Sequence, residues 1–237
     1  MGREGLCGKF HAFGLVVICL AMPVPVIATE DNPGAWLSFS LSDAIQSGGE
    51  DTRWHYWVDS QARFFDPASG ATQFVIRPAI GYRITDSLKG WVGYARFRAE
   101  NSAGAVAHEN RYWQQLDWPA GRFRGGNVSM RTRLEQRSVS IGEDIGIVLR
   151  FQTKYVRPFG TKGQNSLIIG IEPFFDLKDT DWKGKSGLTQ NRTFIGIGWR
   201  VAGSMSIETG YMNQYIWVDG QEDRSFHHGV LNFNIRM

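Results

Sequence analysis

Charged and amide side chains stand at every second position in two stretches of this sequence. The stretch "ENRYWQQ" holds Glu109, Arg111, Trp113 and Gln115, and the stretch "RTRLEQR" holds Arg131, Arg133, Glu135 and Arg137. Residues two apart in a β-strand share one face. Because the planar guanidinium of arginine can donate two parallel hydrogen bonds to a carboxylate, this spacing predicts ion pairs between neighbouring strands.

Charged residues of the same phase recur along the chain and extend the predicted network. They are Asp59, Arg63, Arg150, Glu172, Arg192, Glu208 and Arg236. Charges that leave water must be paired and hydrogen-bonded, so this face belongs inside a narrow lumen. There it would either fill a barrel and fix the strand register, or form a constricted pore whose arginine excess selects anions.

A second group of reactive side chains precedes the last alternating segment. Ser225, His228 and Glu222 are residue types used in acyl transfer, and they are weak catalytic candidates here. The alternation places His228 with the charged face and the adjacent His227 with the apolar face. No Gly-x-Ser-x-Gly elbow accompanies them, so no catalytic residue is assigned. A lipid-modifying enzyme acting at the rim is the alternative function.

Neither a cofactor nor a metal site is expected. The chain has five histidines, and Asp179 with Asp181 gives only a faint calcium signal. The formal net charge of +3 is too balanced to indicate a nucleic-acid partner.

The elements that must position these residues are strands. In "RWHYWVDSQARFF", residues 53–65, one face collects Trp54 and Val58 while the other collects Asp59 and Arg63. A helix can also be drawn through this stretch, but similar segments elsewhere carry interior glycine and β-branched residues, which disfavour helices. Short turns at 85–87 and 202–204 contrast with longer polar loops at 101–108, 177–189 and 219–225. This arrangement predicts an all-β fold: a closed antiparallel transmembrane barrel of about ten to twelve strands.

The count of strands raises a conflict. Eleven segments alternate, whereas a bacterial barrel with both ends on one side of the membrane needs an even number. The sequence therefore favours ten or twelve strands: either the first segment, residues 34–42, is not a full strand, or one strand has been merged with another or missed.

The first 28 residues have the features of a signal peptide. Arg3 and Lys9 precede the apolar run 10–20, and small residues follow at 26–28. We expect residues 1–28 to be removed and residues 29–237 to form one barrel domain. Cys7 and Cys19 lie in the predicted leader, so the mature chain would have no cysteine for a disulfide or a thiol nucleophile.

A periplasmic β-sandwich that binds a ligand is a further alternative, because sandwiches also alternate. The barrel is favoured by the density of arginine with acids, and by aromatic residues near predicted strand ends that suit an interfacial girdle. These aromatics are Trp54, Phe64, Tyr82, Trp91, Trp118, Tyr155, Trp199 and Tyr215. The expected location is the outer membrane of a Gram-negative bacterium. The expected partners are outer-membrane lipids, lipopolysaccharide and, during biogenesis, the barrel-assembly machinery.

Five ordered blocks resemble the domain-of-unknown-function family numbered 2490: "LKGWVGYARF", "ENRYWQQLDW", "RTRLEQR", "QNRTFIGIGWRV" and "IETGYMNQY". The resemblance runs from about Trp36 to the C-terminus. It implies an outer-membrane β-barrel and supplies no reaction. The chain departs from the usual barrel ending, because its last residue is Met237 where an aromatic is common.

Overall fold

The computed structural model describes residues 30–66, 70–160 and 163–236, and within them the chain forms eleven strands. Their bounds are β1 Glu30–Ser47, β2 Glu50–Asp66, β3 Ala71–Arg83, β4 Lys89–Glu100, β5 Val106–Phe123, β6 Gly126–Val139, β7 Ile145–Phe159, β8 Asn165–Asp176, β9 Gly187–Ala202, β10 Met205–Ile216 and β11 Arg224–Arg236. The predicted leader, residues 1–28, lies outside the described residues. No helix in the described ranges is both long and apolar enough to cross a membrane.

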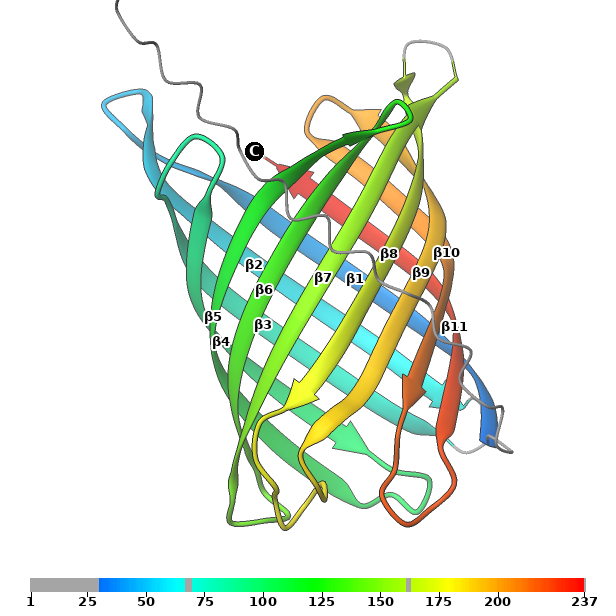
Figure 1. The fold of residues 1–237 in the computed structure, drawn as a ribbon. Helices are drawn as coiled ribbons and strands as arrows, with labels where there is room; N and C mark the ends of the chain where they lie inside the picture. The colour runs from blue at the N-terminus through cyan, green and yellow to red at the C-terminus, as the bar shows by residue number, and fades with distance from the viewer. Residues whose placement is uncertain (1–29, 67–69, 161–162, 237) are drawn as a thin grey trace, which may run out of the picture.

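The strands close into a barrel in which each strand pairs with its sequence neighbour. These pairs are antiparallel, but β1 and β11 complete the ring as a parallel pair that runs from Glu30↔Arg224 to Ser42↔Arg236. Figure 1 shows β1 in blue beside β11 in red. One parallel pair allows an odd number of strands to close. The eleven segments counted in the sequence are therefore confirmed, and the restriction to ten or twelve strands is wrong. The start of β1 and the end of β11 consequently lie at opposite rims.

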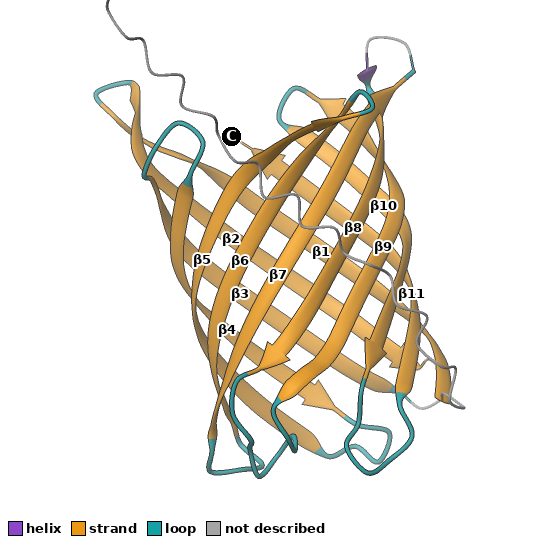
Figure 2. Ribbon diagram, in the orientation of Figure 1, coloured by secondary structure: helices purple, strands orange, loops and turns teal. Residues whose placement is uncertain are grey.

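The two rims differ in the length of their connections (Figure 2). Residues 48–49, 84–88, 124–125 and 203–204 form the short-turn rim. Residues 101–105, 140–144, 177–186 and 217–223 form the long-loop rim. The predicted long loops are confirmed at 177–186 and 217–223, whereas the connections at 101–105 and 140–144 are no longer than the one at 84–88, so the contrast between the rims holds only in part.

The wall of the barrel is apolar outside and largely polar inside. In β3, Val75, Arg77 and Ala79 are buried, whereas Phe74 and Ile76 are 47% and 54% exposed on the outer face. A sandwich would bury its apolar rows between two sheets. The closed ring and the outward apolar rows show that the sandwich alternative is wrong.

One strand departs from the expected distribution of aromatic and charged residues. In β4, Trp91 points inward and packs against the apolar interior cluster, so its predicted place in an outer girdle is wrong. A Cβ added at Gly81 would lie 2.5 Å from the Trp91 ring, and one at Gly93 would lie 2.3 Å from the Trp113 ring. Glycine at these two inner positions therefore leaves the space in which both indoles lie inside the barrel.

Candidate functional site

Three adjacent strands, β5 to β7, place the charged residues around Glu135. Strand β6 pairs with β5 so that Trp113 lies opposite Glu135, and with β7 so that Arg133 lies opposite Arg150. Because directly opposed residues in a sheet share a face, these inner side chains are held against one another by the strand register.

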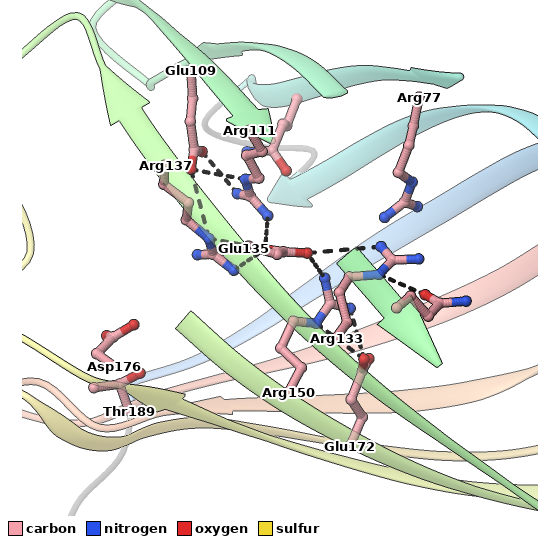
Figure 3. A network of polar contacts seen from close by, with 12 residues as sticks. Arg77, Glu109, Arg111, Arg133, Glu135, Arg137, Arg150, Glu172, Asp176 and Thr189 are labelled. Carbon is pink, nitrogen blue, oxygen red and sulfur yellow. Dashed lines mark hydrogen bonds and ion pairs between the residues drawn. The ribbon is translucent and has the colours of Figure 1, made fainter. Parts of the chain in front are cut away.

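Glu135 is the centre of the ion-pair network, and only 1% of its surface is exposed. Arg137 donates to its Oε2 at 2.6 and 2.9 Å, and Arg111 donates to the same oxygen at 3.2 Å. Arg150 donates to Oε1, and Arg133 Nη1 lies 3.7 Å from that oxygen. Figure 3 shows the carboxylate among these four guanidinium groups.

Two further carboxylates extend the network along the wall. Glu109 accepts hydrogen bonds from Arg111 at 2.7 and 2.8 Å. Glu172 accepts from Arg150 at 2.7 and 3.0 Å and also from Arg131. The charges of neighbouring arginines are thus shared among carboxylates that come from different strands, which makes a buried cluster of this kind tolerable.

An aromatic layer adjoins the network and fills part of the lumen. The Arg133 guanidinium lies 4.1 Å from the centre of the Trp113 ring and 5.5 Å from that of Trp57, and its Nε donates to Gln115 at 2.6 Å. Arg133 is 0% exposed and Trp113 is 1% exposed. No solvent path therefore passes between these side chains.

Some participants were not among the predicted site residues. Arg77 donates to both oxygens of Asp59 at 2.7 and 2.8 Å, and Lys154 pairs with Glu208 at 2.9 Å. The signal for Arg77 was its alternation in β3, which Pro78 interrupts. Lys154 had the correct phase in its segment and a charge of the right sign.

The surroundings of Arg63 and Arg192 differ from those of the arginines in the ion-pair network. The Arg63 guanidinium carbon lies 3.7 Å from the centre of the Trp36 ring and that of Arg192 lies 4.9 Å from it. Arg63 donates to amide oxygens, at 3.1 Å to Gln61 and 2.6 Å to Gln73. Neither arginine forms an ion pair with a carboxylate in the described part of the chain. Both line a cavity of about 280 Å³, here called the central cavity.

Arg236 stands apart from the other predicted lumen residues. Its side chain is exposed at the short-turn rim, where it lines a wider opening, and its backbone N–H donates to Ser204 O at 2.8 Å. The structure therefore does not bring Arg236 into the ion-pair network.

The three weak catalytic candidates do not form one group. Glu222 is exposed in the loop before β11, and His228 is fully buried inside the barrel, where it packs edge-on against Trp36 at 5.8 Å. Ser225 lies on the outer face and contacts His227 instead, with Ser225 Oγ 3.3 Å from His227 Nε2. The grouping of Ser225 with His228 is wrong because residues one and three apart in a strand face opposite sides.

Ser225 and His227 belong to a chain of polar contacts on the outer face. The hydroxyl of Tyr211 lies 2.5 Å from His227 Nδ1, and Asn213 Nδ2 donates to Ser225 Oγ at 2.8 Å. The i, i+2 spacing of Ser225 and His227 was the signal in the sequence that could have identified this pair.

The loops at the long-loop rim brace one another. Asp181 accepts hydrogen bonds from the backbone N–H groups of Glu143 and Asp144, and the Glu143 bond is the main cause that lowers the pKa of Asp181. Asp179 accepts from the backbone of Ser186. Both carboxylates thus stabilise the loops by accepting hydrogen bonds from backbone N–H groups. In the described ranges, no cluster of three or more histidine, cysteine or acidic residues could hold a metal ion.

Lys183 extends from the loop between β8 and β9 toward the end of the lumen. It forms an ion pair with Asp176 and donates to Thr189 Oγ1 at 3.1 Å. Figure 3 shows Asp176 and Thr189 away from the Glu135 cluster. Burial, followed by the positive charge of Arg137, lowers the pKa of Lys183 to about 8.

Comparison with known proteins confirms the resemblance seen in the sequence blocks. The model of a family described as "Protein of unknown function (DUF2490)" matches residues 33–225. The chain is 36% identical over 160 residues to an uncharacterized protein of Methylorubrum extorquens strain AM1, covering 67% of this chain and 70% of that protein. No solved structure matches the chain.

Proposed function

The chain belongs to the family of proteins of unknown function numbered 2490, and we propose that it is an outer-membrane barrel whose lumen is closed. In this proposal the protein is a structural component of the envelope of a Gram-negative cell. The narrow-pore function then applies only when the charged network moves. Export by the predicted leader and insertion by the barrel-assembly machinery are parts of the same proposal.

The apolar outer face supports insertion into a bilayer. Large apolar side chains are exposed on strands around the ring, and they include Ile76, Ile80, Val92, Ile195 and Val201. In water such a surface would favour aggregation, whereas lipid solvates it. Closure of the ring also leaves no strand edge with unpaired backbone groups.

Charged residues outside the barrel are consistent with lipid partners. Arg96 and Arg98 lie on the outer face near the end of β4, close to the long-loop rim. Arg96 donates to Asn110 at 2.7 Å, and Arg98 pairs with Glu100 at 2.7 Å. In the proposed membrane these guanidinium groups would lie where lipopolysaccharide phosphates are found, and phosphate is a group that arginine binds well.

The observation that carries the closed lumen is the layer of Trp113, Arg133 and Glu135. Each of these side chains is at most 1% exposed. A barrel of this strand number is narrow enough for side chains to fill it. An open porin would instead keep such residues in contact with water.

Two measurements test this function. Membrane fractionation with heat-modifiable gel migration is expected to place a compact, heat-sensitive form in the outer membrane. Planar-bilayer recordings of the unaltered protein are expected to show no steady current. Arg133→Ala, which removes the cation covering Trp113, is expected to give small current steps, and the outer-face control Arg98→Ala should give none.

Two results would contradict the proposal. A protein found only in the periplasmic fraction would exclude the outer-membrane location. A large steady conductance from the unaltered protein would exclude the closed lumen.

A second candidate function is hydrolysis of an acyl ester at the outer face, carried by the contacts of Ser225. In this reaction Ser225 Oγ attacks the ester carbonyl while its proton passes to His227 Nε2, and the leaving alcohol then takes that proton. Water hydrolyses the acyl-serine with His227 again acting as base. Tyr211 at Nδ1 would orient the ring. Ser225 is 6% exposed, so a neighbouring side chain must first move aside.

Lipid profiling distinguishes this candidate from a purely structural barrel. If Ser225 is a nucleophile, Ser225→Ala should change the phospholipid or lipid A acyl profile, whereas Ser138→Ala should not. Ser138 is an exposed serine on the outer face of β6 near the same rim. An identical profile in the Ser225→Ala strain and the unaltered strain would remove the enzyme candidate.

A further inference from the structure

The central cavity has an unbalanced charge. Its cationic lining residues include Arg77, Arg131, Arg150 and Lys154, each of which forms an ion pair with a carboxylate of Asp59, Glu172 or Glu208. Arg63 and Arg192 line the same cavity, and neither has such a partner in the described residues. The cations of the wall therefore outnumber its carboxylates.

The hydrogen bonds of these two arginines are satisfied without cancelling their charge. Arg63 donates to Gln61 and Gln73. With the Gln190 amide turned so that its oxygen faces Arg192, that oxygen accepts from Nε and Nη2 at 2.9 and 3.1 Å. A neutral amide satisfies a donor but leaves the positive charge. Two such charges that lie against the same Trp36 ring repel each other in a medium that screens them poorly.

The parallel seam between the strands that carry these two arginines supplies neutral donors. At the parallel seam, Ser38 Oγ donates to Asn232 Oδ1 at 2.6 Å and Ser40 Oγ donates to Asn234 Oδ1 at 2.8 Å. These bonds occupy the amide oxygens and leave each Nδ2 amino group as a donor. All four residues line the cavity. Such a wall suits a ligand that accepts hydrogen bonds.

We infer that the central cavity binds a small oxyanion, a carboxylate or an inorganic phosphate or sulfate, between Arg63 and Arg192. The anion supplies a negative charge that no carboxylate of the described residues places within ion-pair distance of these two guanidinium groups, although Glu172 lies opposite Arg192 across β8 and β9. A guanidinium has five N–H groups, so those that the glutamine amides leave unfilled can donate to an oxyanion. The inference goes beyond the proposed function, because it needs only the closed barrel and not its location in a membrane.

Size and access limit the ligand. A volume of about 280 Å³ is at the lower end of ligand pockets, so a phosphate or a short dicarboxylate fits better than a nucleotide or an oligosaccharide. Arg131 and Gln152 line both this cavity and the wider opening at the short-turn rim. The anion therefore enters from that rim, opposite the long loops.

The test is calorimetric titration of the purified full chain in detergent, in chloride-matched buffer. Inorganic phosphate, sulfate and succinate are the probes, and comparing them separates an inorganic oxyanion from a carboxylate. At least one probe is expected to bind. Arg63→Gln and Arg192→Gln are each expected to weaken that binding tenfold or more. Arg157→Gln, which removes the same charge from an exposed position on the outer face of β7, should leave it unchanged.

A third variant distinguishes charge from shape. Arg192→Lys keeps the charge but loses the planar fork, so it is expected to retain weakened binding. Heat-modifiable migration checks that every variant is folded, and if a glutamine variant fails that check, the unaltered chain and Arg192→Lys still decide the question. The inference would be overturned if no probe bound the folded, unaltered chain. It would also be overturned if both glutamine variants bound the probe as tightly as the unaltered chain does.

Discussion

The two sides of the lumen accommodate the charges of their buried arginines in different ways. On the side formed by β5 to β8, Glu109, Glu135 and Glu172 share the charges of the arginines around them. On the side where β1 and β2 meet β9 to β11, Arg63 and Arg192 lie against Trp36 with amide acceptors only.

The difference indicates two roles for one residue type. Where each guanidinium reaches a carboxylate, the protein itself balances the charges of the cluster. Removing one member then leaves a buried charge without its partner. On the second side, no carboxylate of the described residues forms an ion pair with Arg63 or Arg192, so in our proposal their charge is available to a ligand. The first side therefore holds the barrel together, and the second side is the place for binding.

The largest expected effect is the loss of Glu135. Glu135→Gln removes the charge that Arg111, Arg137 and Arg150 share, and breaking a buried pair costs about 3–5 kcal/mol. Urea unfolding in detergent measures the change in the free energy of unfolding. Glu100→Gln, at an exposed ion pair, is the control and is expected to cost less than about 1 kcal/mol. Equal losses in both variants would contradict the assigned role of Glu135.

The Asp59–Arg77 pair, between β2 and β3, tests whether a buried ion pair of the lumen can be replaced by apolar packing. Asp59→Leu alone is expected to cost about 3 kcal/mol, because Arg77 is then buried without its partner. Adding Arg77→Met should restore most of that loss. Unfolding of both single variants and the double variant completes the cycle. Additive losses would show that the two side chains do not stabilise the fold as a pair.

Two inner glycines compare the packing of the aromatic layer with that of the central cavity. A Cβ at Gly93 would meet Trp113 at 2.3 Å and the Pro78 carbonyl oxygen at 2.8 Å, so Gly93→Ala should cost about 1–3 kcal/mol. A Cβ at Gly170, in the wall of the central cavity, would meet its nearest atoms at 3.8 Å. Gly170→Ala should therefore change unfolding by less than about 0.5 kcal/mol. The reverse order would show that the cavity side is the more tightly packed one.

A smaller effect depends on pH and comes from Lys183 at the long-loop rim. Its pKa of about 8 in the folded chain is below its ordinary value of 10.5. Between these values the unfolded chain binds a proton that the folded chain lacks, so the free energy of unfolding rises with pH over this window. The rise is expected to be about 1–3 kcal/mol.

Unfolding measured from pH 7 to 10.5 checks this prediction. Lys183→Met should remove the rise, whereas Lys185→Met, an exposed lysine in the same loop, should retain it. A rise that persists in Lys183→Met must come from another group and would contradict the assignment.

The faces of the strands could be predicted from the sequence, but the heights of residues along the barrel could not. Period-two alternation places Glu135 and Arg63 on the same inner face. Which carboxylates reach which arginines depends on the register of neighbouring strands, and alternation does not contain that information. For this reason the sequence grouped Arg63 and Arg192 with the paired arginines.

The closure of the barrel and the contacts on its outer face could not be predicted either, because both depend on how the strands pair. A strand that alternates reads the same whether its neighbour is parallel or antiparallel, so the direction of β1 beside β11 was not predictable. His228 was placed correctly on the inner face. Ser225 was nevertheless grouped with it by closeness in sequence, although the alternation itself put Ser225 with His227.

The inside-out distribution of residues in a membrane is the claim on which the proposed function depends. The most direct measurement attaches a fluorophore to Ile76→Cys, on the outer face, and to Ser40→Cys, in the central cavity. In reconstituted vesicles, brominated lipids should quench the label at 76 but not that at 40, and aqueous iodide should not reach position 76. Quenching of the label at 76 by iodide, with no effect of brominated lipid, would contradict the claim.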